Sequence, residues 1–154
     1  MLEPPQIVET TEQLSAVIRL TIPREEIRHV MGPGITELMG VVSKQCIGPT
    51  GAWFSHHLRF DPDVFDFEIG VPVSAPVTPE GRVVGSWLPA ATVLRATYQG
   101  PYEGLGDAWA EFDAWVKAQG FELIGNAWEI YQSGPETGLD PSTYRTEINR
   151  PIKV

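Results

Sequence analysis

Short stretches of alternating hydrophobic and polar residues dominate this chain. The clearest covers residues 13–22, where every second residue from Leu14 to Ile22 is apolar. An alternation with period two predicts a strand with one buried face. Further extended stretches are predicted over residues 51–60, 65–73, 82–88, 91–98, 126–133 and 143–152.

Two stretches follow the helical period instead. The first begins at Pro23, which suits the first turn of a helix, and residues 32–34 (Gly-Pro-Gly) should interrupt it before a further helical segment over 35–44. The second runs from about 100 to 119, and Gly120 caps its C-terminal end. Its apolar stripe, which should face a core, consists of Leu105, Trp109, Phe112 and Val116.

The chain also contains an internal repeat. Residues 61–73 align without a gap to residues 140–152, 79 positions later, and five of the thirteen aligned pairs are identical. Chance alone gives roughly one identity, so the match indicates a duplication. Each copy carries a glutamate at the same position of its predicted strand, Glu68 in one and Glu147 in the other.

The order of elements is the same around both copies, namely strand-helix-strand-strand. We therefore predict an α+β fold in a single domain over 1–154, with repeats at about 13–73 and 82–152 related by a pseudo-two-fold axis. Antiparallel sheets should carry the helices on one side and leave a ligand groove on the other. When the alignment is extended to the preceding strands, His56 corresponds to Tyr131.

Charge and composition narrow the classes of partner. The net charge of −9, with scattered basic residues, argues against direct nucleic-acid binding, and it suits either cationic ligands or simple solubility. No apolar run reaches the length of a membrane span, and the N-terminus lacks the pattern of a secretion signal, so we expect a cytoplasmic protein. Cys46 is the only cysteine and cannot form an intrachain disulfide.

The repeated glutamates, Glu68 and Glu147, are the first candidates for a binding site. Strand alternation places each on the face opposite its neighbouring isoleucine. If the isoleucines face the helices, both carboxylates lie on the open side, where they could bind an organic cation or act as a general acid or base. Arg145 shares a face with Glu147, so a structural ion pair is the competing interpretation.

Aromatic residues near the predicted strands could complete such a site, because ring faces bind cations. Tyr131 and Tyr98 are the better candidates, since each carries a hydroxyl on a strand, although core packing competes for every ring. The predicted ligand-binding residues are Glu147, Glu68, Tyr131, His56, Phe54, Tyr98, Tyr102 and Trp128. The three histidines match no metal-binding spacing, and the sequence has no phosphate-binding loop, so we expect no metal and no cofactor.

Several short motifs occur in a fixed order along the chain. They are Asp-Phe-Glu-Ile-Gly-Val-Pro-Val at 66–73, Leu-Pro-Ala at 88–90, Gly-Pro-Tyr at 100–102, Trp-Glu-Ile-Tyr at 128–131, Asp140-Pro141, Thr-Glu-Ile at 146–148 and Pro151. In these motifs and their spacing the chain resembles the GyrI-like small-molecule-binding family, the effector-binding domains of AraC- and MerR-type transcription activators. The resemblance extends from about residue 14 to residue 152.

The resemblance implies a duplicated fold with a ligand groove between the halves, Glu147 as its central acidic residue, and Tyr131 at the place of a family tyrosine. His56 stands where a second aromatic residue is usual. Drug-responsive relatives bind cationic, aromatic compounds, which implies multidrug binding. About a dozen residues precede the first strand, too few for a helix-turn-helix. We therefore expect a stand-alone form, with a separate regulator or protein target as a candidate partner.

Three functions remain open. A binding protein for hydrophobic, cationic or aromatic small molecules is favoured, because binding requires no catalytic geometry. The resemblance also implies a cofactor-free hydrolase of cyclopropane-containing DNA-alkylating compounds, with Glu147 as general acid or base and Tyr131 as a hydrogen-bond donor. The third is a protein-protein inhibitor, such as a topoisomerase modulator, whose action would not depend on Glu147.

Overall fold

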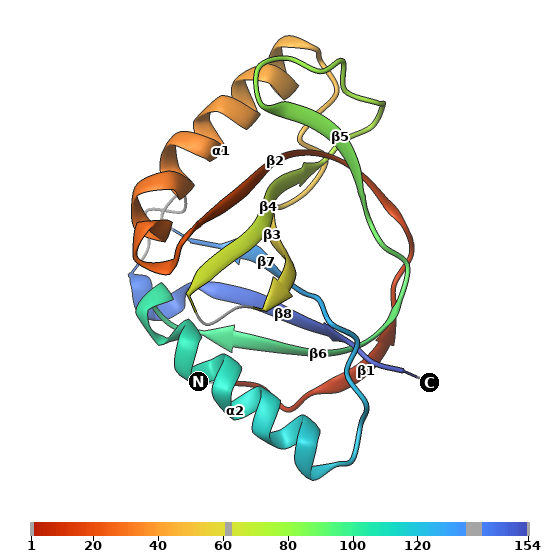
Figure 1. The fold of residues 1–154 in the computed structure, drawn as a ribbon, viewed down its shortest axis with the longest axis vertical. Helices are drawn as coiled ribbons and strands as arrows, with labels where there is room; N and C mark the ends of the chain where they lie inside the picture. Colours follow the sequence, from red (N-terminus) through yellow and green to blue (C-terminus); the bar gives the residue numbers. More distant parts are fainter. Residues whose placement is uncertain (1, 61–62, 135–139, 154) are drawn as a thin grey trace. The chain divides into compact units, whose positions relative to one another are not determined.

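The computed structural model describes residues 2–60, 63–134 and 140–153, and its mixture of strands and helices confirms the α+β class (Figure 1). The repeat residues Asp61 and Pro62 lie outside the described residues. The elements, with η for short 3₁₀ helices, are β1 (Gln6–Glu9), β2 (Gln13–Pro23), η1 (Arg24–Glu26), α1 (Ile27–Lys44), β3 (Phe54–Phe60), β4 (Val64–Pro72), β5 (Val83–Leu88), β6 (Thr92–Gln99), η2 (Tyr102–Gly104), α2 (Leu105–Ala118), β7 (Ala127–Ser133), η4 (Pro141–Thr143) and β8 (Arg145–Pro151). None of the described helices is long and apolar enough to span a membrane.

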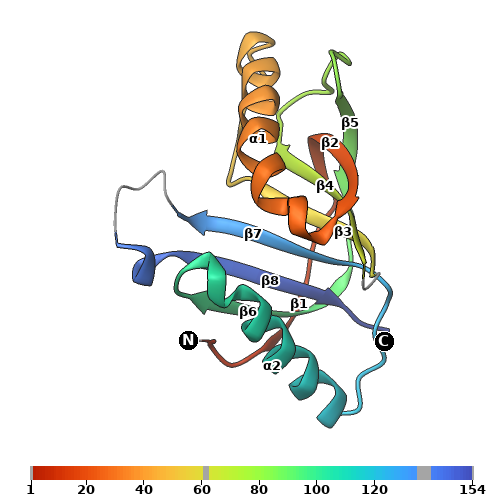
Figure 2. The same cartoon turned by 60° about the vertical axis from the view of Figure 1, so that its left-hand side comes forward.

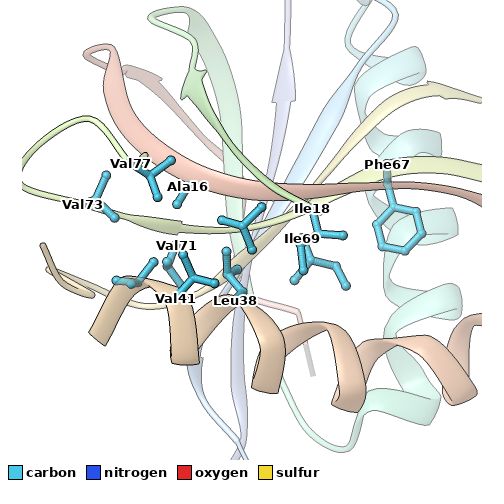
Figure 3. Packing of buried hydrophobic residues seen from close by; sticks show 11 residues of the cluster. Ala16, Ile18, Leu38, Val41, Phe67, Ile69, Val71, Val73 and Val77 are labelled. Carbon is cyan, nitrogen blue, oxygen red and sulfur yellow. The ribbon is translucent and has the colours of Figure 1, made fainter. Parts of the chain in front are cut away.

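The chain folds as two compact units. The first unit is Thr11–Ala90, and its strands lie in the order β3-β4-β2-β5 with antiparallel pairing. Helix α1 covers one face of these strands. Figure 3 shows Leu38 of α1 pointing toward Ile18 of β2 and Ile69 of β4, and all three side chains are fully buried. Their alternation along β2 and β4 puts the polar residues of these strands on the other face.

The second unit consists of Met1–Thr10 and Ala91–Val154, with strand order β1-β6-β8-β7 and antiparallel pairing. Helix α2 lies along one face of its strands, as Figure 2 shows. Phe112 of α2 is buried against Leu94 of β6 and Ile148 of β8. The predicted apolar stripe of this helix is therefore correct, and Gly120 ends the helix with a φ of 79°.

One strand belongs to a different half than the sequence indicated. Residues 82–88 were predicted to open the second repeat, but β5 pairs with β2 and lies in the first unit. Its place beside β6 is taken by β1, which the sequence pattern did not predict. Both units still contain a strand-helix-strand-strand core with one additional edge strand. The proposed duplication and its pseudo-two-fold axis stay predictions.

The predicted break in the first helix is wrong, because α1 is continuous through Pro33. A proline inside a helix removes one backbone hydrogen bond and costs about 3 kcal/mol. Two features of the structure accompany the unbroken helix near Pro33. The Thr36 hydroxyl donates to the carbonyl of Gly32 at 3.1 Å. A side chain at Gly34 would meet Ile69 Cδ1 at 2.7 Å, so glycine permits the close packing of the helix on β4.

Candidate functional site

Glu147 lies on the face of the second unit that points away from α2. Its neighbour Ile148 packs against the helix, and alternation places Glu147 on the other side. The carboxylate forms an ion pair with Arg95 at 3.0 Å and accepts hydrogen bonds from Gln132 at 3.0 Å and Asn149 at 3.3 Å. The structural ion pair anticipated for Glu147 therefore exists, although Arg95 of β6 provides it.

Glu68 takes the corresponding position in the first unit, on the face away from α1. His56 lies opposite it in β3, with 3.7 Å between His56 Nδ1 and Glu68 Oε1. Phe54 is nearby on the same face, where its ring lies over Gly70 so closely that a side chain there would overlap it. Three of the predicted residues are thus neighbours, and within this unit they form a mostly buried group.

Tyr131 lies on the opposite face of its strand from Glu147. Tyr131 pairs with Thr146, which lies on the same face of β8 as Ile148, so the Tyr131 side chain points to the side of α2. Glu129, two residues earlier in β7, points to the same side. The Tyr131 hydroxyl donates to Glu129 Oε1 at 2.8 Å, and the indole Nε1 of Trp109 donates to Oε2 at 2.8 Å. Glu129 is only 7% exposed. Two hydrogen-bond donors thus hold this carboxyl group in a poorly solvated part of the unit.

The ring of Tyr131 belongs to a group of three tyrosine rings. The ring of Tyr102, in η2, lies 5.7 Å from that of Tyr131 at 70° and 5.4 Å from that of Tyr144 at 45°. We call these three residues the tyrosine cluster. Edge-to-face and tilted ring pairs at such distances stabilise each other and present their faces in several directions. The cluster thus joins η2, β7 and the residue before β8, and Tyr131 connects it to Glu129.

Two further predicted residues have other roles. Tyr98 is buried, and its hydroxyl donates to the carbonyl of Pro101 at 2.8 Å, which fixes the turn before α2. Burial, with the nearby charges of Glu103 and Asp107, raises the pKa of Tyr98. Trp128 is 1% exposed and lies on the face of its strand that carries Glu147 on the neighbouring strand.

The hairpins of the two units share one irregularity, which corrects the extended alignment. The pairing of β3 with β4 shifts after His57, and that of β7 with β8 shifts after Tyr131. His57 lies opposite Phe67, the residue before Glu68, and Tyr131 lies opposite Thr146, the residue before Glu147. By strand register, therefore, His57 and not His56 corresponds to Tyr131.

The sequence reading missed Glu129, Trp109 and Tyr144 as site residues. A signal for Glu129 was present, because it stands two positions before Tyr131 and so on the same face of a strand. Trp109 was assigned to the core from its helical spacing, and its indole nitrogen instead reaches the carboxylate. Among the described residues, no group of three or more acidic, histidine or cysteine side chains is placed to hold a metal ion.

Solved structures share this fold. The C-terminal domain of EcmrR matches with a TM-score of 0.83 and 22% identity, over 97% of each chain. SAV2435 bound to tetraphenylphosphonium matches with a TM-score of 0.71 and 15% identity, over 98% of this chain and 94% of that one. A hydrolase encoded by lin2189 from Listeria innocua matches with a TM-score of 0.63 and 12% identity, over 97% and 91%.

This chain spans 57% of the length of EcmrR in its complex with DNA, which it matches with a TM-score of 0.80 and 21% identity. Among curated protein sequences, none matches the chain. A sequence model of the GyrI-like small molecule binding domain matches residues 3–153, nearly the whole chain. The protein therefore belongs to the GyrI-like family of small-molecule-binding domains, as the order of its motifs had indicated.

Proposed function

We propose that this GyrI-like domain binds hydrophobic organic cations, and that Glu129 with the tyrosine cluster forms the contact set. The observation that carries the proposal is the buried Glu129 carboxylate, whose oxygens accept from the neutral groups of Tyr131 and Trp109 at 2.8 Å. The phenol of Tyr131 and the indole of Trp109 each orient one oxygen of the carboxylate. A cation that leaves water for this place gains a stronger attraction than it would have at an exposed acid.

The tyrosine cluster supplies the apolar and cation-binding surface. Rings hold a positive charge best over their faces, within about 6 Å of the ring centre. Tyr102 contacts both Tyr131 and Tyr144, so the rings are inclined to one another rather than stacked in one plane. Inclined rings can contact several sides of a bulky ligand, which suits large aromatic cations.

The first unit contains one example of a cation held over a ring face, formed by Arg24 and Phe65. Phe65 precedes the glutamate of β4 by three residues, as Tyr144 does in the second unit, and Arg24 follows Pro23 as Tyr102 follows a proline. Arg24 Cζ lies 4.5 Å from the centre of the Phe65 ring. A guanidinium thus lies against the ring of Phe65, the residue that the predicted repeat aligns with Tyr144.

Glu147 is a weaker candidate for the same role. Arg95 forms an ion pair with it at 3.0 Å, so an incoming cation would compete with an existing positive charge. Two comparisons support an organic cation as the ligand. The chain belongs to a family of small-molecule-binding domains, and the similar protein SAV2435 is bound to tetraphenylphosphonium. The net charge of −9 further favours the approach of cations through long-range attraction.

A hydrolase is the second candidate, and the contact between Glu129 and Tyr131 favours it. A carboxylate beside a phenol can accept a proton from water while the phenol donates to a developing oxyanion. These roles fall to Glu129 with Tyr131, since Glu147 lies on the other face of the strands from Tyr131. The matching hydrolase from Listeria innocua keeps this candidate open.

The test compares two probes of one shape and opposite charge, tetraphenylphosphonium and tetraphenylborate, by calorimetric titration. We expect the cation to bind, and Glu129→Gln to weaken it without weakening the anion. Equal binding of both probes by wild type would refute a charge-selective site. Incubation with a cyclopropane-bearing alkylator, followed by mass spectrometry, separates the candidates, because only a hydrolase yields a water adduct that Glu129→Gln abolishes.

A further inference from the structure

The edge strand β5 of the first unit carries an unusual surface. Its sequence, Val-Val-Gly-Ser-Trp-Leu, contains no charge and no proline. Two of its side chains are large, apolar and exposed: Trp87 at 52% and Val84 at 41%. Edge strands of monomeric proteins usually carry charges, prolines or bulges that prevent pairing with another chain. The strand β5 has none of these within its bounds.

The outer backbone of β5 is also positioned for pairing. Val83 exchanges hydrogen bonds with Glu80 in the preceding turn, with N–O distances of 3.0 and 3.1 Å. These groups therefore point away from β2. Because backbone groups alternate along a strand, Gly85 and Trp87 direct their N–H and C=O groups to the same outer side.

We propose that two copies of this chain associate by antiparallel pairing of β5 with β5, around a two-fold axis at Ser86. In this register Gly85 lies opposite Trp87 of the partner copy, and the two equivalent pairs form four backbone hydrogen bonds. The alternative register centred on Gly85 would require the outer groups of Val83, which Glu80 already occupies. The turn before β5 thus selects one register.

The side chains fit the same arrangement. The Trp87 indole would lie over Gly85 of the partner copy, which has no side chain to obstruct it. The nearest atom to a Cβ at Gly85 is Val77 Cγ1 at 3.8 Å, so the indole meets an apolar neighbour there. On the other face Val84 would lie against Leu88 of the partner copy. Both exposed apolar side chains are covered by one contact.

Sedimentation equilibrium over a range of protein concentrations tests the proposal. We expect a reversible dimer that salt strengthens, because each copy carries a net charge of −9. Val84→Lys should weaken the dimer at least about tenfold by placing a charge against Leu88 of the partner copy. Ile7→Lys is the matched control, since Ile7 is 59% exposed on the edge strand β1, and it should leave dimerisation unchanged.

A disulfide cross-link tests the register without relying on a disruptive variant. With Cys46→Asn as background, Ser86→Cys places two thiols directly opposite at a pair without hydrogen bonds, where Cα atoms lie about 4.5 Å apart. It should form a covalent dimer on mild oxidation, whereas Val84→Cys should not. A monomer at every concentration, or a dimer that Val84→Lys leaves intact and Ser86→Cys does not link, would overturn the proposal. A complex in which β5 pairs with a strand of a different protein, and not with β5 of a second copy, would also overturn it.

Discussion

The Tyr131 hydroxyl donates a hydrogen bond of 2.8 Å to the Glu129 carboxylate inside the second unit. This pair joins Tyr131 to an acid that stands two residues earlier on the same strand. Glu147, the acid singled out by the repeat, is on the other face and bound to Arg95. The proposed binding chemistry therefore depends on the local geometry of β7 rather than on the internal repeat.

Removal of the Tyr131 hydroxyl should affect both stability and binding. In Tyr131→Phe the ring remains, while Oε1 of Glu129 loses the hydrogen bond from the Tyr131 hydroxyl. We expect the free energy of unfolding to fall by about 1–3 kcal/mol, since a buried acceptor loses a hydrogen bond. Affinity for tetraphenylphosphonium should fall severalfold because the carboxylate is less well oriented.

Urea unfolding and calorimetric titration of the same samples measure the two effects of Tyr131→Phe. Tyr144→Phe is the control, because it removes a hydroxyl from the tyrosine cluster and keeps the ring contact with Tyr102. If Tyr131→Phe behaves like this control in both measurements, its hydrogen bond to Glu129 contributes nothing to the site.

The turn ahead of α2 should tolerate no side chain at Gly104. A Cβ there would overlap the hydroxyl of Tyr98, which must then abandon its bond to Pro101. Gly104→Ala should lower the free energy of unfolding by about 1–3 kcal/mol. Gly106→Ala, where nothing lies within 4 Å, should be neutral or stabilising by up to about 1 kcal/mol. Thermal unfolding that ranks the two variants in the reverse order would contradict this account.

Asp66 should make the fold sensitive to acid. Burial raises the pKa of Asp66, but hydrogen bonds from Arg59 at 2.9 Å and Thr21 at 3.2 Å and the charge of Arg19 outweigh it and hold the pKa below its ordinary value. A carboxylate with a lower pKa in the folded state stabilises the fold above its unfolded pKa. That stabilisation disappears as the pH falls through the folded pKa.

We therefore expect stability to decline from about pH 4 downward, where an unfolded aspartate begins to bind protons. Urea unfolding of wild type and Asp66→Asn between pH 7 and pH 3 measures the contribution. The variant should be less stable at pH 7 and lose less stability with acid. Parallel curves for the two proteins would assign the acid sensitivity to other groups.

Local pattern predicted most elements of this fold because strand and helix periods are local properties. The alternation from Leu14 onward became β2, and the stripe around Phe112 became the buried face of α2. Pairing between strands is not local, and this explains the error about β5. Its sequence predicts an extended stretch, but only its register with β2 assigns it to the first unit. The continuous helix through Pro33 likewise reflects packing on the sheet, which overrides a local preference.

The candidate site was only partly accessible from sequence for the same reason. The face of Glu147 followed correctly from alternation, yet its partner Arg95 sits on β6, 52 positions away along the chain. Nothing in the pattern near Glu147 reveals that ion pair. Tyr131 was selected for its hydroxyl on a predicted strand and again by the resemblance. Alternation along the same strand would have added Glu129.

The most direct test of the central claim is the dissociation constant of tetraphenylphosphonium for wild type, Glu129→Gln and Glu147→Gln, measured by calorimetric titration at one ionic strength. Each variant removes one negative charge and keeps the shape of the side chain, so the pair is matched. We predict that Glu129→Gln weakens binding by about tenfold or more, while Glu147→Gln, whose charge Arg95 already balances, changes it less than about threefold. The opposite ranking, with Glu147→Gln abolishing binding and Glu129→Gln leaving it intact, would contradict the account.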